Sequence, residues 1–165
     1  KTIFVAALNG ASAGGGLGLA LACDVRVASS NAKMAASYSG IGLSPDGGTT
    51  WLLPRLVGEQ TARKFFLENQ VWNAEEAHYL GAIDEVVGDE ELIPREVELA
   101  NFMSQWGSHT KEATKHLLLS QNYNDFETHL KHEQTLIEAA GTTASFAEGI
   151  DAFLSKRKPD FSNDR

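Results

Sequence analysis

Val5-Ala-Ala-Leu-Asn-Gly-Ala-Ser-Ala-Gly-Gly-Gly-Leu-Gly-Leu-Ala-Leu-Ala-Cys-Asp24 is the segment that decides the fold of this 165-residue chain. An apolar run passes through three consecutive glycines, Gly14 to Gly16, into leucines and alanines at helical spacing. Where a helix begins at glycines, a ligand can approach the backbone closely and meets unpaired N–H groups and the positive end of the helix dipole. The segment therefore predicts a site for negative charge at a strand-to-helix turn.

Two nucleotide-binding motifs do not fit this turn. The dinucleotide fingerprint needs glycine or alanine at its sixth position, and counting from Gly14 or Gly16 places a leucine there. A phosphate-binding P-loop needs Gly-Lys-Ser/Thr, and no lysine stands between Lys1 and Lys33. An oxyanion hole remains, in which N–H groups stabilise a carbonyl oxygen that becomes negative during a reaction. The alternative interpretation is a close strand–helix crossing that needs small residues.

Composition narrows the class of protein. A net charge of −8, with lysine and arginine clustered only at Lys156-Arg-Lys158, argues against a nucleic-acid partner. No apolar stretch reaches the roughly 18 residues of a membrane span. Cys23 is the single cysteine, so an internal disulfide is impossible and a reducing compartment fits. We therefore expect a soluble, cytoplasmic protein with one domain and a helical tail.

The hydrophobic pattern predicts an α/β chain that becomes helical toward its C-terminus. Strands are predicted at 3–8, 24–28, 33–36 and 83–87, and helices at 16–23, 59–68 and 74–79. Asn73 is the expected N-cap of the last of these helices. Ser44-Pro45-Asp46 predicts a further helix start, because serine caps helices, proline suits the first turn and an acid favours the positive end. From Glu90 onward the pattern is almost entirely helical.

Several ordered blocks resemble the crotonase family, also called the enoyl-CoA hydratase/isomerase superfamily. The opening segment matches the family signature from its apolar strand through Asn9-Gly10 to Cys23-Asp24. Three further blocks are similar to the family, and they are Gly42–Gly58, Asn73–Val87 and Glu148–Phe161. The resemblance implies the C-terminal part of a crotonase-like ββα spiral core at residues 1–87. Residues 88–165 would then be a helical region for CoA contact and for assembly into a homotrimer or a dimer of trimers.

The same resemblance implies an acyl-CoA thioester as the substrate. Its carbonyl oxygen would receive two backbone N–H groups that stabilise an enolate, and Gly15 matches the position of one of these donors. The second donor would lie in a segment upstream of Lys1. No separate cofactor is expected, since CoA is part of the substrate.

The acidic residues then select the reaction. Hydratases of the family use two glutamates, and the matching positions here hold Gly18 and, less securely, Tyr38. Asp46 stands where double-bond-shifting isomerases of the superfamily carry an acid. One carboxylate suffices to move a proton between carbons of a polarised thioester. The resemblance therefore favours an enoyl-CoA isomerase, whereas the structural alternative is that Asp46 only caps the helix it begins.

Other functions stay open. Asp46 is a candidate nucleophile, as in aryl-CoA dehalogenases of the superfamily, and hydratase or hydrolase activity or a non-catalytic acyl-CoA-binding or assembly module are further alternatives. Tyr38 and Trp51 are candidates for an acyl pocket, although an aromatic near a helix start more often serves packing.

Two residues of the C-terminal block and a pair of histidines are the remaining candidates for binding residues. Phe153 and Lys156 match family residues that approach the adenine and phosphate of CoA, and a solvated charge is the alternative for the lysine. His129 and His132 have helical spacing, but without accompanying cysteine or acidic ligands they predict no metal site.

Overall fold

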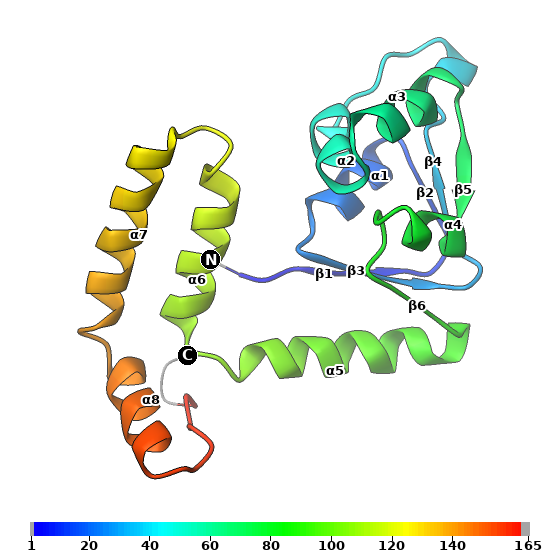
Figure 1. Ribbon diagram of the computed structural model, residues 1–165. Coiled ribbons are helices and arrows are strands. Elements are labelled where there is room, and N and C mark those ends of the chain that lie inside the picture. Colours follow the sequence, from blue (N-terminus) through cyan, green and yellow to red (C-terminus); the bar gives the residue numbers. More distant parts are fainter. Residues whose placement is uncertain (1, 163–165) are drawn as a thin grey trace. The chain divides into compact units, whose positions relative to one another are not determined.

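A computed structural model describes residues 2–162 of the chain (Figure 1). The chain divides into two compact units, one of Ile3–Ala100 and one formed mainly by the residues from Asn101 onward. The first unit is mixed α/β and the second is helical. The predicted boundary between residues 87 and 88 stays a prediction.

The α/β unit contains two small sheets. One is parallel, with strand order β1 (Val5–Leu8), β3 (Val25–Ser29) and β6 (Glu85–Val87). The other has the order β2 (Ala11–Ala13), β4 (Lys33–Ala35) and β5 (Val71–Asn73), with β2 parallel and β5 antiparallel to β4. The chain steps from the first sheet to the second twice, from β1 to β2 and from β3 to β4. Each step is a ββ unit, and the helix α1 connects the two.

Four predicted strands are confirmed within two residues at each end, but β2 and β5 were not predicted. Both have only three residues, with an exposed, buried, exposed pattern. So short an alternation carries little periodic signal. These strands form because neighbouring strands offer hydrogen-bonding partners, which is information that the local sequence does not hold.

Helix α1 (Gly15–Ala22) lies between the first two ββ steps and is apolar on every face. Leu17 is fully buried and Leu21 nearly so. They join a core that also holds Leu53 and the rings of Phe65 and Trp72, whose centroids are 4.2 Å apart. Leu19 is 75% exposed, so α1 packs into the core by one face although its residues are apolar all round.

The helix predicted to start at Ser44-Pro45-Asp46 begins later, so that prediction was wrong. Helix α2 spans Thr49–Val57, and its N-cap is Gly48. Gly47 and Gly48 have φ angles of 60° and 77°, in the left-handed region that favours glycine and that a right-handed helix excludes. Asp46 consequently lies in a loop ahead of the helix.

Two further helices follow as predicted. Helix α3 spans Glu59–Leu67 and α4 spans Ala74–Tyr79. Asn73 caps α4, because its side-chain oxygen accepts a hydrogen bond of 2.8 Å from the N–H of Glu76. The predicted N-cap is therefore confirmed.

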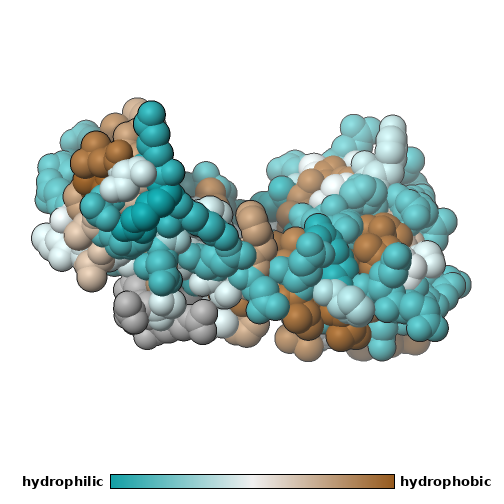
Figure 2. Space-filling view, turned by 90° about the horizontal axis from the view of Figure 1, so that it is seen from below, coloured by the Kyte–Doolittle hydropathy of each residue, from teal (hydrophilic) through white to brown (hydrophobic). Residues whose placement is uncertain are grey.

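Long helices make up the rest of the chain. They are α5 (Leu92–Ser104), α6 (Ser108–Ser120), α7 (Phe126–Ala140) and α8 (Ala144–Leu154). Helices α6 and α7 lie side by side as a hairpin (Figure 1). Large apolar side chains are exposed on these helices, and Figure 2 shows apolar surface on the helical unit as well as on the α/β unit. None of the helices within residues 2–162 is long and apolar enough to cross a membrane.

Candidate active site

The glycine turn leaves backbone N–H groups unpaired at the start of α1. Gly14 is the N-cap, with a φ of 53° that suits glycine. The N–H of Gly18 is the first in the helix to find an intrahelical acceptor, the carbonyl oxygen of Gly14 at 3.2 Å. Gly15, the candidate oxyanion donor, is exposed at the first helical position. Its N–H is one of those that a helix start leaves without an intrahelical acceptor.

The loop that carries Asp46 is pressed against this turn. A Cβ built on Gly18 would lie 2.5 Å from the carbonyl oxygen of Gly47, and one built on Gly47 would lie 3.8 Å from the Cα of Gly15. Only glycines allow two backbones to approach this closely. The residue that follows Asp46 is thus held beside Gly15, the candidate oxyanion donor, so the structure brings the two candidate segments together.

Asp46 is exposed, and its carboxylate does not cap α2. The backbone carbonyl of Asp46 accepts hydrogen bonds from the N–H of Thr49 at 3.1 Å and from its hydroxyl at 2.9 Å. The N-cap Gly48 makes no side-chain capping bond. The expectation that Asp46 caps α2 by a side-chain hydrogen bond is therefore wrong.

Tyr38 contacts this carboxylate from the protein interior. The tyrosine is only 5% exposed, and its hydroxyl is 3.2 Å from Oδ1 of Asp46. The ring packs against Phe66, with centroids 6.4 Å apart. The contact with Asp46 could not be predicted from the sequence, because the path of the loop between the two residues, which includes the left-handed Gly42, is set only in the folded chain.

Trp51 lies on an exposed face of α2. It is 47% exposed, and the guanidinium of Arg55 stands 3.5 Å from its ring centroid. An adjacent groove of about 590 Å³ is lined by residues that include Pro45, Arg63 and Phe66, but by neither Trp51 nor Tyr38. The structure therefore places Tyr38 at Asp46 and Trp51 on the surface under an arginine.

Asp24 has a structural role at the other end of α1. Its carboxylate accepts a hydrogen bond of 2.8 Å from the N–H of Phe4, and its own N–H donates to the carbonyl of Phe4 at 2.9 Å. These bonds join the chain just before β1 to the chain just after α1.

Comparison with known proteins places this geometry in a family. The family model described as enoyl-CoA hydratase/isomerase matches residues 1–164. The chain belongs to this family. It is 37% identical over 158 residues to 1,2-epoxyphenylacetyl-CoA isomerase of Escherichia coli K12, covering 96% of this chain and 60% of that protein. It is 36% identical over 157 residues to crotonyl-CoA hydratase of Syntrophomonas wolfei, covering 95% of this chain and 60% of the hydratase.

Solved structures of the family share the fold. An enoyl-CoA hydratase/isomerase from Cupriavidus metallidurans superposes with a TM-score of 0.90 at 36% identity, covering 95% of this chain and 59% of that one. The predicted crotonase-like fold and family are therefore confirmed. The chain spans about 60% of the length of these relatives. Their names cover both an isomerase and a hydratase, so the family alone does not select the reaction.

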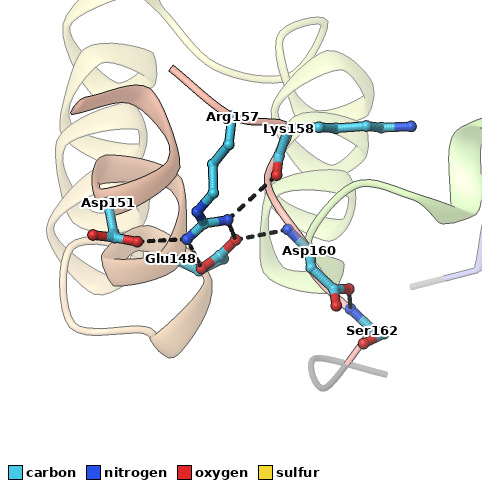
Figure 3. Close-up of polar contacts among 6 residues, drawn as sticks. All are labelled: Glu148, Asp151, Arg157, Lys158, Asp160 and Ser162. Carbon is cyan, nitrogen blue, oxygen red and sulfur yellow. Dashed lines mark hydrogen bonds and ion pairs between the residues drawn. The ribbon is translucent and has the colours of Figure 1, made fainter. Parts of the chain in front are cut away.

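The two residues expected to contact CoA lie at the end of α8. Phe153 is 81% exposed, and Lys156 is exposed just beyond the helix with a left-handed φ of 54°. Next to them, Arg157 donates to both carboxylate oxygens of Glu148 at 2.6 and 2.8 Å (Figure 3). This contact, followed by the N–H of Asp160, lowers the pKa of Glu148 from 4.5 to about 2. An ion pair thus anchors the segment that carries Lys156.

His129 and His132 make separate contacts within the helical unit. Across residues 2–162, no three His, Cys, Asp or Glu side chains are grouped as a metal site would require. The imidazole of His129 instead lies 3.5 Å from Glu133 on the same helix, and His132 lies 3.2 Å from the amide of Asn124.

Proposed function

We propose that this chain carries the proton-transfer site of an enoyl-CoA isomerase, an enzyme that moves a double bond along the acyl chain of a CoA thioester. Asp46 is the acid–base group, and the N–H of Gly15 is one donor to the thioester oxygen. The observation that carries the proposal is the seating of Gly47 on α1, which holds the residue after Asp46, whose side chain is exposed, against the glycine turn that contains Gly15. The substrate class follows from the family, whose named relatives are CoA-thioester enzymes.

The same contact argues against hydration. The family resemblance puts the first hydratase glutamate at Gly18, yet a Cβ there would lie 2.5 Å from the Gly47 carbonyl oxygen. Real Cβ atoms do not approach a backbone oxygen so closely, so a glutamate would require the loop to move. Tyr38 holds the second position, and a phenol is a poor base for activating water at neutral pH. Asp46 is then the acid that remains.

The reaction balances with one carboxylate. Ionised Asp46 takes a proton from the carbon next to the thioester carbonyl, and the electrons of that C–H bond enter a conjugated enolate. The N–H of Gly15 donates to the enolate oxygen, where the negative charge develops. Asp46, now a carboxylic acid, returns the proton to the far end of the conjugated system. A second N–H donor from outside residues 1–165 would complete the oxyanion hole, and no further cofactor is needed.

The test uses the full-length protein and its Asp46→Asn variant with 3-enoyl- and 2-enoyl-CoA in deuterated water. We expect isomerisation and deuterium uptake to fall roughly 10²- to 10⁴-fold, the usual contribution of a general acid–base group. Glu75→Gln, which neutralises another exposed carboxylate of the same unit, is the control and should leave both rates unchanged.

Product mass separates the alternatives, because isomerisation conserves mass whereas water addition or halide loss does not. Unchanged isomerisation in Asp46→Asn would refute the assignment, and binding without turnover of any thioester would favour a non-catalytic module.

The helical region is proposed to serve CoA contact and assembly. Phe153 and Lys156 are exposed and could meet the adenine and phosphate of CoA. Large apolar side chains of α5–α8, such as Phe102 and Ile137, are at least half exposed, which suits burial between subunits of a homotrimer or a dimer of trimers. Sedimentation of the full-length protein tests the assembly. A rise in KM for CoA thioesters in Lys156→Ala, with kcat unchanged, tests the phosphate contact.

A further inference from the structure

Tyr38 contacts Asp46 from a rigid position. The tyrosine is 5% exposed, and its ring is held against Phe66. Its hydroxyl lies 3.2 Å from Oδ1 of Asp46, 3.4 Å from the backbone carbonyl of Asp46 and 3.4 Å from the hydroxyl of Thr49. All three neighbours can accept a hydrogen bond, and the carboxylate oxygen is both the nearest and the most strongly accepting.

An ionised carboxylate has no hydrogen to donate, so in the contact at 3.2 Å the phenol of Tyr38 donates and Oδ1 of Asp46 accepts. Thr49 is 1% exposed, and its hydroxyl donates its one hydrogen to the carbonyl of Asp46 at 2.9 Å. Toward Tyr38 this hydroxyl can only accept, so it competes with the carboxylate for the phenol hydrogen, and the nearer, charged oxygen is the stronger acceptor.

The two oxygens of the carboxylate are then unequal. Oδ1 is bonded to Tyr38, whereas none of the described residues 2–162 hydrogen-bonds to Oδ2. Within residues 2–162, the other hydrogen bonds at Asp46 involve its backbone carbonyl and do not hold its side chain. Without the phenol, the carboxylate of an exposed aspartate would rotate among its staggered positions.

We propose that Tyr38 is a positioning residue, whose hydroxyl holds Asp46 by Oδ1 so that Oδ2 is the oxygen that carries the proton. The proposal rests on the function proposed above and adds which oxygen acts and what orients it. A base that is held in a reactive position reacts faster than one that has to find that position. Tyr38 is thereby given a role in orientation, in place of the acyl-pocket lining expected from the sequence.

The kinetic test combines Tyr38→Phe with Asp46→Asn in the full-length protein. Tyr38→Phe removes one oxygen, and we expect kcat for isomerisation to fall about tenfold while KM is unchanged, because the substrate does not contact the phenol. In the Asp46→Asn background the same change should cost no further activity. Tyr79→Phe, which removes the hydroxyl of an 89% exposed tyrosine, is the matched control and should have no effect. An unchanged kcat, or an equal loss in both backgrounds, would overturn the proposal.

A second measurement is independent of activity. The ¹³Cγ signal and the side-chain couplings of Asp46 report whether its carboxylate has one orientation or several. We expect one orientation in the parent protein and averaging in Tyr38→Phe, with no change in Tyr79→Phe. Averaging in the parent protein would refute the positioning role even if Asp46→Asn abolishes isomerisation. If Asp46→Asn leaves isomerisation unchanged while Tyr38→Phe still releases the carboxylate, the proposed function fails and the positioning contact stands.

Discussion

Gly47 places its carbonyl oxygen in the space that a side chain on Gly18 would need, since a Cβ there would lie 2.5 Å from it. Gly18→Ala should therefore destabilise the protein by about 2 kcal/mol, the typical cost of overpacking a close contact. Gly16→Ala is the control, because a Cβ on Gly16 meets nothing within 4 Å in the same helix. Urea unfolding measures both variants. Equal stability of the two would show that the loop yields easily.

The same contact predicts that hydratase activity is not gained by restoring the missing acid. Gly18→Glu should displace the loop that carries Asp46, lowering isomerisation without producing hydrated thioester. Product mass from 2-enoyl-CoA decides the outcome. Efficient hydration by this single variant would mean that Gly47 does not block a side chain at position 18.

Arg26 predicts a second large loss of stability. Its side chain is almost fully buried in β3 and donates to the carbonyls of Cys23 at 2.6 Å and Ala82 at 2.9 Å and to Asp84 at 3.1 Å. Arg26→Met would leave buried acceptors unpaired, so we expect a loss of about 3 kcal/mol in urea unfolding. Arg95→Met removes an arginine that is bonded to Glu85 and whose side chain is 33% exposed, and it should change stability much less. Similar losses of stability in both variants would show that the burial of Arg26 is not what makes its contacts stabilising.

Asn73 offers a test of the cap of α4. Its side-chain oxygen accepts from the N–H of Glu76 at 2.8 Å. Asn73→Ala removes this acceptor and should lower the free energy of unfolding by about 1 kcal/mol. Asn73→Asp keeps an acceptor at the same place and should retain stability. If both substitutions have the same effect, the hydrogen bond is not what stabilises this helix start.

The ion pair of Glu148 and Arg157 predicts a pH dependence. The pKa of Glu148 is lowered to about 2 in the folded chain, from 4.5, chiefly by hydrogen bonds from Arg157. Because protonation is harder in the folded than in the unfolded state, the stability from this contact is complete above about pH 4.5 and is lost as the pH falls toward 2. An NMR titration of the carboxyl carbon measures the pKa directly.

Two variants identify the cause of that shift. Arg157→Ala should return the pKa of Glu148 toward 4.5. Lys158→Ala removes a neighbouring positive charge whose side chain bonds to Gln105 instead, and it should leave the low pKa in place. A low pKa that persists without Arg157 would assign the effect to the N–H of Asp160 alone.

Local sequence was enough to predict much of the fold. The apolar run before Gly14 and the leucines after Gly16 predict β1 and α1, because a strand and an apolar helix differ in length and in residue type. The cap at Asn73 was equally local, since a capping side chain bonds to a backbone N–H only three residues away. The strands β2 and β5 escaped prediction because three residues hold too little pattern.

The features of the candidate site also fall into those that the sequence predicted and those that only the structure revealed. Gly15 and Asp46 were predicted as site residues from motifs in the sequence, and the family was predicted from the order of those motifs. Only the tertiary structure decided that Asp46 stands outside α2, that Gly47 fills the space beside Gly18 and that the phenol of Tyr38 reaches Oδ1. Periodicity and capping act over a few residues, so the sequence records them directly. The seating of a loop on a distant helix depends on backbone angles and packing between segments far apart in the chain, which are fixed only when the chain has folded.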